Sequence, residues 1–158
     1  MVIGVTGGTG FIGRYFLSSY ANKHKIVVLT TKKGNIERIG GEEYRYTDYS
    51  IDSLKEILTG CDAVVHMAGK RSSADAERSA VNYFDNVTVS ENVFQASRLL
   101  GIKNLVVLSS MSVYNPSMAM PLKEEFTSPY SLYGVSKMTV ENRRKANISN
   151  GITRRANL

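Results

Sequence analysis

The glycine-rich stretch TGGTGFIG at residues 6–13 constrains the fold of this chain more than any other part of its sequence. It follows a run of mostly β-branched residues at 2–6, which predicts a buried strand. It leads into residues 11–22, where apolar side chains recur at the spacing of an amphipathic helix. A strand, a glycine turn and a helix in this order predict a unit that binds a dinucleotide.

Each glycine of this stretch has its own expected task. Gly7 permits a tight turn, Gly10 lets the backbone approach a pyrophosphate, and Gly13 allows the helix to pack closely on the sheet. The free N–H groups where the helix starts, at Phe11 and Ile12, then face an anion. We therefore expect all five residues to contribute to cofactor binding.

The rest of the chain alternates short β-branched runs with longer helical patterns. The expected strands after the first are 25–30, 43–47, 63–68 and 104–110, with a sixth beginning within 151–158. The expected helices are 11–22, 50–58, 75–100 with a break near Ser79, and 131–147. This alternation predicts an α/β fold: a Rossmann-like, doubly wound parallel sheet with helices on both faces. We expect residues 1–158 to form one NAD(P)-binding domain.

The second expected strand ends in Thr30, Thr31, Lys32 and Lys33, where a dinucleotide site usually has an acid that binds the ribose 2′-OH. Two hydroxyls and two ammonium groups suit a 2′-phosphate better than a carboxylate would, which favours NADP. A solvated basic turn explains the same residues equally well. Both NAD and NADP therefore stay open, with Thr31 and Lys32 as candidate contacts.

The net charge of +6 suggests a nucleic-acid partner, but its distribution argues against one. Five of the 20 basic residues lie in 142–158, which holds no acid, and the rest of the chain is nearly neutral. No apolar run is long enough for a membrane span, and the N-terminus shows no secretory pattern. The single Cys61 rules out an intrachain disulfide framework. We expect a cytoplasmic protein without a nucleic-acid, membrane or metal partner.

Five stretches in this order make the chain resemble the extended short-chain dehydrogenase/reductases, in the sugar-nucleotide epimerase/dehydratase group. The stretches are TGGTGFIG (6–13), DAVVHMAG (62–69), YFDNV (83–87), VLSSMSVY (107–114) and SPYSLYGVSK (128–137). The resemblance covers almost the whole chain. It implies epimerisation of a nucleotide-sugar, such as a UDP-hexose, with NAD or NADP as cofactor.

The resemblance assigns catalytic roles to three residues. Ser110 would hydrogen-bond the reacting oxygen, Tyr133 would be the general acid/base, and Lys137 would hold the nicotinamide ribose. Lys137 follows Tyr133 by four residues, so on a helix the two lie on the same face, and the ammonium charge favours the phenolate. The phenolate can accept a proton from a sugar hydroxyl while hydride leaves the same carbon.

The resemblance also assigns cofactor contacts beyond the glycine loop. They are Asp48 at the adenine amino group with Tyr49 beside it, the backbones of Met67, Ala68 and Gly69, Asn86 beneath the cofactor, and Tyr133 with Lys137 at the nicotinamide end.

The reaction stays open at this point. Dehydratases of the family carry two acids where this chain has Met111 and Ser112, and neither can perform an elimination. Epimerisation, favoured by the resemblance, and NADP-dependent reduction of a nucleotide-sugar or ketone, favoured by Thr31 and Lys32, remain. A non-catalytic dinucleotide-binding regulatory module is the alternative of another class, although such a module has no need of Ser110, Tyr133 and Lys137 together.

The family extends past the length of this chain into a lobe that binds the nucleotide-sugar. We therefore expect a truncated N-terminal part whose activity by itself is weak or absent. The family pairs subunits through helices equivalent to residues 82–100 and 131–147, which predicts a homodimer.

Overall fold

Five parallel strands form one sheet in the computed structural model, which describes residues 1–34, 36, 38–70 and 79–149. The strands are β1 (Val2–Thr6), β2 (Lys25–Thr30), β3 (Glu43–Tyr46), β4 (Ala63–His66) and β5 (Asn104–Val107), and their order is β3-β2-β1-β4-β5. Strand order reverses beside β1, between β2 and β4. In open parallel sheets, ligands bind at such a point, outside the carboxyl ends of the strands.

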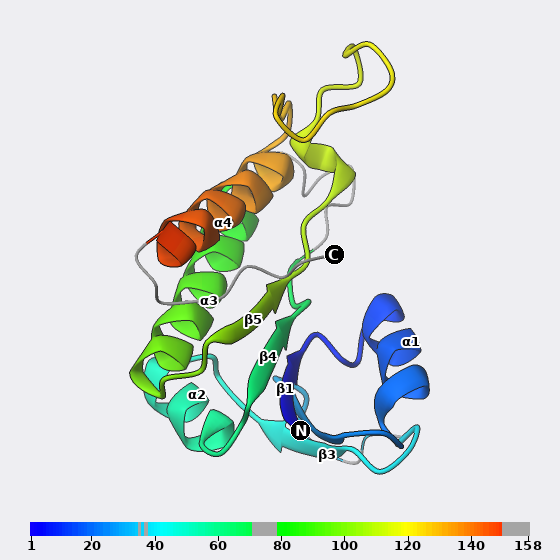
Figure 1. Ribbon diagram of the computed structural model, residues 1–158, viewed down its shortest axis with the longest axis vertical. Helices are drawn as coiled ribbons and strands as arrows, with labels where there is room; N and C mark the ends of the chain where they lie inside the picture. The colour runs from blue at the N-terminus through cyan, green and yellow to red at the C-terminus, as the bar shows by residue number, and fades with distance from the viewer. Residues whose placement is uncertain (35, 37, 71–78, 150–158) are drawn as a thin grey trace.

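Helices cover both faces of this sheet, as the sequence predicts (Figure 1). They are α1 (Phe11–Tyr20), α2 (Ile51–Leu58), α3 (Ala80–Leu99) and α4 (Leu132–Ser149), with a short 3₁₀ helix, η2 (Met111–Val113), after β5. In Figure 1, α1 lies on one side of the strands, and α2, α3 and α4 lie on the other.

Each face has its own apolar core. Leu17 of α1 is fully buried against β1 and β2, where Val5 and Val28 are also fully buried. On the opposite face, Leu54 of α2 and Val93 of α3 are fully buried in a larger cluster. Burying such side chains stabilises the fold by about 1.5–3 kcal/mol each.

The strands line up so that their carboxyl ends meet at one edge. Thr6 at the end of β1 pairs with His66 at the end of β4, and His66 pairs with Val107 at the end of β5. On the other side, Thr6 pairs with Leu29 near the end of β2. The glycine turn and the segments after β2, β4 and β5 therefore leave the sheet together.

Several elements end earlier than the sequence predicts. β4 ends at His66 rather than residue 68, because the N–H of Ala68 bonds the Thr6 hydroxyl instead of a neighbouring strand. β5 ends at Val107 rather than residue 110, where the Leu108 carbonyl accepts a bond from Lys137.

The helix boundaries follow their caps. Ser50 caps α2 through the N–H of Ser53, as predicted. The break expected near Ser79 is the start of α3, where Ser79 caps the N–H of Asn82. α1 ends at Tyr20 rather than residue 22. Residues 75–78 and the sixth strand expected within 151–158 lie outside the described residues.

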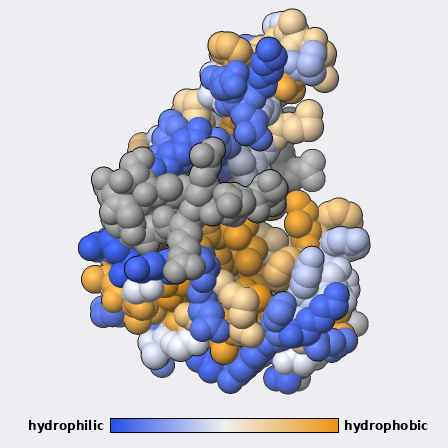
Figure 2. Space-filling view, viewed as in Figure 1, coloured by the Kyte–Doolittle hydropathy of each residue, from blue (hydrophilic) through white to orange (hydrophobic). Residues whose placement is uncertain are grey.

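The described residues cover the face that carries α1 only in part. Figure 2 shows hydrophobic side chains gathered at the centre of the view, where Figure 1 draws β1, β4 and β5. On β5, Leu105 is 2% exposed on the α3 side, whereas Val106 is 47% exposed on the other. Among the described helices, none is long and apolar enough to cross a membrane.

Candidate active site

The glycine loop after β1 packs closely at Gly7 and Gly13. Gly7 has a φ of +74°, and a Cβ added there would lie 2.6 Å from the backbone nitrogen of Ala68. A Cβ at Gly13 would collide with the backbone of Gly7 and Gly8, so α1 can approach β1 only without a side chain. Both glycines are required by the fold itself.

Gly10 differs, because the protein leaves space beside it. A Cβ added at Gly10 would meet only the Gly7 carbonyl oxygen, at 3.3 Å. Gly10 is also the N-cap of α1 and provides no side-chain bond to the first N–H groups of that helix. The open side of Gly10 and these N–H groups fit a bound pyrophosphate.

A cleft of about 370 Å³ opens beside this loop, at the switch point of the sheet. Its lining residues come from the glycine loop and from the segments after β2, β3 and β4, together with one face of α3. They are Gly7, Thr9, Gly10, Leu29, Thr30, Thr31, Lys32, Tyr49, Met67, Ala68, Gly69, Lys70, Asp85, Asn86 and Val89.

Nine of the residues predicted to contact a cofactor line this cleft. They are Gly7, Gly10, Thr31, Lys32, Tyr49, Met67, Ala68, Gly69 and Asn86. Asp48 does not line it: its exposed carboxylate accepts the N–H of Ser50 at 2.8 Å. Hydrogen bonds from Ser50, first from its side chain and then from its backbone, lower the pKa of Asp48.

Phe11 and Ile12 begin α1, but their side chains turn away from the cleft. Phe11 is 93% exposed, and both residues line a separate apolar hollow with Tyr15 and Ile39. Any contact of Phe11 or Ile12 with a cofactor must therefore come from their backbone N–H groups.

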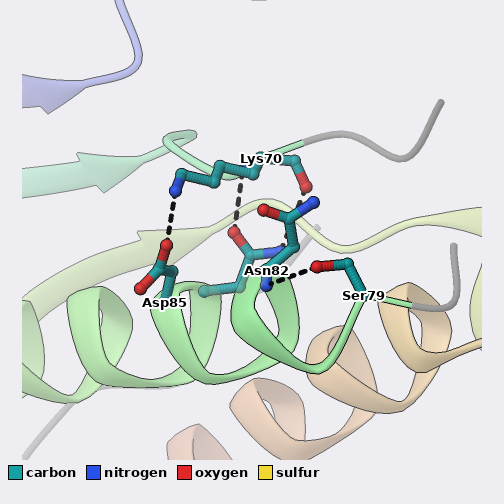
Figure 3. A network of polar contacts seen from close by, with 5 residues as sticks. Lys70, Ser79, Asn82 and Asp85 are labelled. Atoms are coloured by element: carbon teal, nitrogen blue, oxygen red, sulfur yellow. Dashed lines mark hydrogen bonds and ion pairs between the residues drawn. The ribbon is translucent and has the colours of Figure 1, made fainter. Parts of the chain in front are cut away.

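The wall of the cleft opposite β2 is fixed by a side chain that binds backbone. Asn86, on α3, accepts the Lys70 N–H at 2.7 Å and donates to the Lys70 carbonyl at 3.1 Å. Figure 3 shows the side chain of Lys70 reaching Asp85, one residue earlier on the same helix. Lys70 is thus held at its backbone and its ammonium group, and the segment after β4 has a defined position.

A buried histidine joins this wall to the glycine loop. His66 Nδ1 lies 2.6 Å from the Thr6 hydroxyl, and Nε2 lies 2.9 Å from the Ser90 hydroxyl. Burial, and then the nearby charge of Lys137, lower the pKa of His66 to about 3. His66 is therefore a neutral residue whose two nitrogens both have partners.

The β2 end of the cleft is basic. The Thr30 hydroxyl accepts the Lys32 N–H at 3.1 Å, which holds the turn that places Thr31 and Lys32 on the cleft. The acid lining the described part of the cleft is Asp85, which is on the opposite wall and paired with Lys70.

Glu42, before β3, is fully buried away from this end of the cleft. Its oxygens accept the N–H groups of Ile39 and Gly40, at 2.6 and 2.8 Å. Burial raises the pKa of Glu42, but these hydrogen bonds outweigh burial and hold the pKa below its usual value. Glu42 thus stabilises the β2–β3 connection and does not supply a carboxylate to the cleft.

Tyr49 forms another part of the cleft wall. It adopts a φ of +61°, which is uncommon for a side chain of this size. Its carbonyl accepts a bond from Asn92 of α3 at 3.0 Å, which holds the unusual conformation in place. Burial raises the pKa of Tyr49 to about 12, so the phenol stays neutral.

Lys137 connects the cleft to the end of β5. The side chain is 8% exposed, and Nζ donates to the Leu108 carbonyl at 3.2 Å. Nζ also lies 5.8 Å from the ring centroid of Tyr133, and a Cβ added at Gly69 would be 3.2 Å from Nζ. Burial lowers the pKa of Lys137. The ammonium therefore lies between the predicted general acid and the cofactor cleft.

Ser110, three residues after the β5 end, lines a second cleft of about 410 Å³. Its hydroxyl caps η2 by accepting the Ser112 N–H at 3.2 Å. Two acids line the same cleft: Glu124 from the loop before α4, and Glu141, which is bonded to the Ser109 hydroxyl. Ser110 thus faces a polar space distinct from the first cleft.

Sequence reasoning missed several residues of the site. Lys70 and Asp85 gave no signal, because residues 15 apart can be recognised as a pair only in the folded chain. Gly134 is a further case: a Cβ there would collide with the Ser112 carbonyl, so the start of α4 touches η2 through a bare backbone. A glycine inside an expected helix was the available signal for this contact.

The comparisons with known proteins identify the family of this chain. The model of the NAD dependent epimerase/dehydratase family matches residues 3–150. A UDP-glucose 4-epimerase of Klebsiella pneumoniae is 30% identical, over 78% of this chain and 99% of that sequence. The UDP-glucose 4-epimerase of Pasteurella multocida (strain Pm70) is 30% identical, over 89% of this chain but 46% of that protein.

Solved structures give the same result. The crystal structure of UDP-N-acetylglucosamine 4-epimerase from Bacillus cereus superposes with a TM-score of 0.84 at 32% identity, covering 97% of this chain and 50% of that one. Apart from the Klebsiella sequence, this chain therefore spans about half the length of these relatives. The chain belongs to the NAD dependent epimerase/dehydratase family, of the extended short-chain dehydrogenase/reductase type.

Proposed function

We propose that this chain is the NAD(P)-binding and catalytic part of a nucleotide-sugar epimerase acting on a UDP-hexose. The observation that carries the proposal is the position of Lys137. Its buried Nζ lies 5.8 Å from the Tyr133 ring and next to Gly69 of the cofactor cleft. Relatives named as UDP-glucose and UDP-N-acetylglucosamine 4-epimerases support this substrate class.

The described residues fit a nicotinamide dinucleotide. Gly10 leaves open space where a pyrophosphate would approach, and the start of α1 offers N–H groups to it. The adenosine end would lie between Thr31 and Tyr49, and the nicotinamide end near Gly69. Bound there, the nicotinamide supplies the reversible hydride acceptor that epimerisation through a keto-sugar needs.

Side chains of this protein would accept and return the proton of the sugar hydroxyl. Tyr133 accepts the proton of the sugar hydroxyl at its phenol oxygen and returns it after the sugar has turned. The Lys137 ammonium, anchored by the Leu108 carbonyl, stabilises the phenolate and binds the ribose hydroxyls. Ser110 donates a hydrogen bond to the sugar oxygen from the second cleft, which would hold the nucleotide-sugar.

A single-turnover assay tests the proposal. The chain is mixed with oxidised dinucleotide and UDP-galactose, and the reduced nicotinamide is followed by its absorbance. We expect Tyr133→Phe and Lys137→Met to slow this reduction by about 100-fold or more. Tyr130→Phe is the matched control, because that exposed ring precedes α4 and should leave the rate unchanged. Equal rates for Tyr133→Phe and Tyr130→Phe would contradict the proposal.

For the cofactor, we propose that NADP binds more tightly than NAD. Thr31 and Lys32 line the β2 end of the cleft, whereas Asp85, the acid of the described lining, is on the opposite wall. A 2′-phosphate would gain charge-assisted hydrogen bonds from these residues. The same feature favours a second candidate function, an NADP-dependent nucleotide-sugar or keto reductase.

Titration with NADPH and NADH tests this preference. We expect NADPH to bind about tenfold more tightly, and Thr31→Asp to reverse the order, since a carboxylate accepts ribose hydroxyls and repels phosphate. Lys32→Gln should weaken the binding of NADPH more than that of NADH, and Lys103→Gln is its matched control, because exposed Lys103 precedes β5 at the opposite edge of the sheet. Tighter binding of NADH by the unaltered chain would overturn the preference and leave the epimerase proposal standing.

We also propose a cytoplasmic homodimer that pairs through α3 and α4. These helices pack side by side, and Arg143 of α4 binds Glu91 of α3 through two hydrogen bonds. Val81 and Phe84 of α3 are 67% and 63% exposed, which gives a second copy apolar surface to cover. Sedimentation equilibrium should show a dimer that Phe84→Glu dissociates; a monomer at high concentration would contradict it.

A further inference from the structure

We propose that His66 is a positioning residue for the cofactor cleft. Its neutral ring links Thr6 to Ser90 and thereby sets the relative positions of two backbone segments that line the cleft, at Ala68 and Asn86. The inference rests on the proposed function, because its effect is read as dinucleotide affinity.

The hydrogen bonds around the ring have one consistent direction. The Ser90 hydroxyl donates to the Asn86 carbonyl at 2.7 Å, so Ser90 Oγ must accept the proton of His66 Nε2. The other nitrogen, Nδ1, is then an acceptor and takes the Thr6 hydroxyl proton at 2.6 Å. Thr6 Oγ1 in turn accepts the N–H of Ala68 at 3.1 Å. The series of hydrogen bonds runs from Ala68 to Asn86 without interruption.

This direction cannot reverse without breaking a bond at one end. The Asn86 carbonyl only accepts, so the single Ser90 hydroxyl proton that it takes cannot also go to the ring, and this bond places the ring proton on Nε2. His66 is 2% exposed, Thr6 is 0% exposed and Ser90 is 5% exposed, so water does not compete for these groups. In such surroundings an unpartnered polar group costs free energy, which makes this series of hydrogen bonds rigid.

Both ends of this series of hydrogen bonds belong to the cofactor cleft. Ala68 lies in the wall after β4, and the Asn86 side chain binds both backbone groups of Lys70 in the same wall. Removing one hydroxyl would therefore loosen the wall of the cleft as well as the core. This second effect separates a positioning role from a purely structural one.

α3 supplies a matched pair of serines for the test. Ser90 and Ser97 are both buried, but the Ser97 hydroxyl has no hydrogen-bond partner among the described residues. We expect Ser90→Ala to weaken binding of the preferred reduced dinucleotide about fivefold, the effect of one lost hydrogen bond. Ser97→Ala should leave the affinity unchanged, and Ser90→Thr, which keeps the hydroxyl, should restore most of it.

A double-mutant cycle then tests whether the ring transmits the effect. Thr6→Val and Ser90→Ala remove partners from opposite nitrogens of His66, so we expect their effects on affinity to be smaller together than the sum of the two. Thr6→Val with Ser97→Ala should be additive. Nitrogen-15 chemical shifts should show the proton of the neutral ring on Nε2 in the unaltered chain.

The outcomes are separable. Equal affinities for Ser90→Ala and Ser97→Ala, a strictly additive cycle, or a ring protonated on Nδ1 would each overturn the positioning role while leaving the cofactor site intact. Failure of the unaltered chain to bind either dinucleotide would overturn the proposed function and this inference together. Melting temperatures measured in parallel identify any variant that loses affinity because it unfolds.

Discussion

The cleft beside the glycine loop, on the proposed cofactor side, and the second cleft, on the proposed substrate side, differ in how fully the described residues enclose them. On the cofactor side, Thr6, His66 and Asn86 are buried. Thr6 is hydrogen-bonded to His66, and Asn86 is hydrogen-bonded to the Lys70 backbone. On the proposed substrate side, Met111, which lines the second cleft with Ser110, is 79% exposed, and Phe126 in the loop before α4 is 60% exposed. The comparison indicates that the proposed cofactor cleft is set by contacts within this chain, whereas the proposed substrate side presents apolar groups that the described residues leave exposed.

The largest expected effect comes from the turn that begins the cofactor side. Gly13→Ala should destabilise the chain by about 3 kcal/mol or more, because the added methyl would collide with the backbone of Gly7 and Gly8. Urea unfolding measures the loss. Gly10→Ala is the contrasting variant and should cost much less, since its methyl would meet only the Gly7 carbonyl oxygen, at 3.3 Å. Equal stability of the two variants would show that the loop is not packed as described.

A second glycine variant tests the junction between the two sides. Gly134→Ala should cost about 2 kcal/mol, because its methyl would push α4 away from the Ser112 carbonyl of η2. The same displacement should slow sugar-dependent reduction, since Tyr133 and Lys137 move with α4. Asn142→Ala, at an exposed position of the same helix, should change neither quantity. An unchanged free energy of unfolding for Gly134→Ala would contradict the contact.

Acid should lower the free energy of unfolding through His66. Its folded-state pKa of about 3 lies below the ordinary value of about 6.5, so the unfolded chain takes up a proton that the folded chain refuses. The free energy of unfolding is therefore highest above pH about 6.5. Below that pH it falls by about 1.4 kcal/mol per pH unit, or by about 2 kcal/mol at pH 5.

Unfolding of the unaltered chain and of His66→Asn, measured between pH 5 and pH 7, checks this prediction. The variant has no ring to protonate, so its stability should fall less steeply across that interval. A parallel pH dependence of the two proteins would show that His66 is not buried in its neutral form.

The smallest effect is expected on the substrate side. Met111→Ser should change the free energy of unfolding by no more than about 0.5 kcal/mol, because most of the side chain is in water. Val93→Ser, at a fully buried position of α3, is the contrasting variant and should cost several times more. A large loss for Met111→Ser would mean that this side is more tightly packed than its exposure indicates.

The sequence predicted the framework because the framework has local signals. β-branched runs, helical periodicity and the Gly7 turn located all five described strands and the four α-helices. Ser50 marked the start of α2, and Ser79, where the sequence predicted a break, is the cap of α3, since a serine cap acts within three residues of itself. The ends of β4 and β5 were placed too late, because they depend on side chains from elsewhere in the chain.

The site was less predictable for the same reason. Thr6 and His66 are 60 residues apart and His66 and Ser90 are 24 apart, so no spacing rule connects them. The sequence placed His66 within the expected strand 63–68, and the structure confirms that His66 lies in β4. Which partners it has, and that they reach the cofactor cleft, depends on the register of β1 with β4 and on the packing of α3.

The most direct test of a cofactor cleft built within this chain is a fluorescence titration with NADPH and NADH, comparing the unaltered chain with Gly10→Ala. We expect saturable binding of one dinucleotide per chain, weakened at least about tenfold by the added methyl while the melting temperature stays the same. No binding to the unaltered chain, or equal binding to Gly10→Ala, would show that the cleft beside the glycine loop is not the cofactor site.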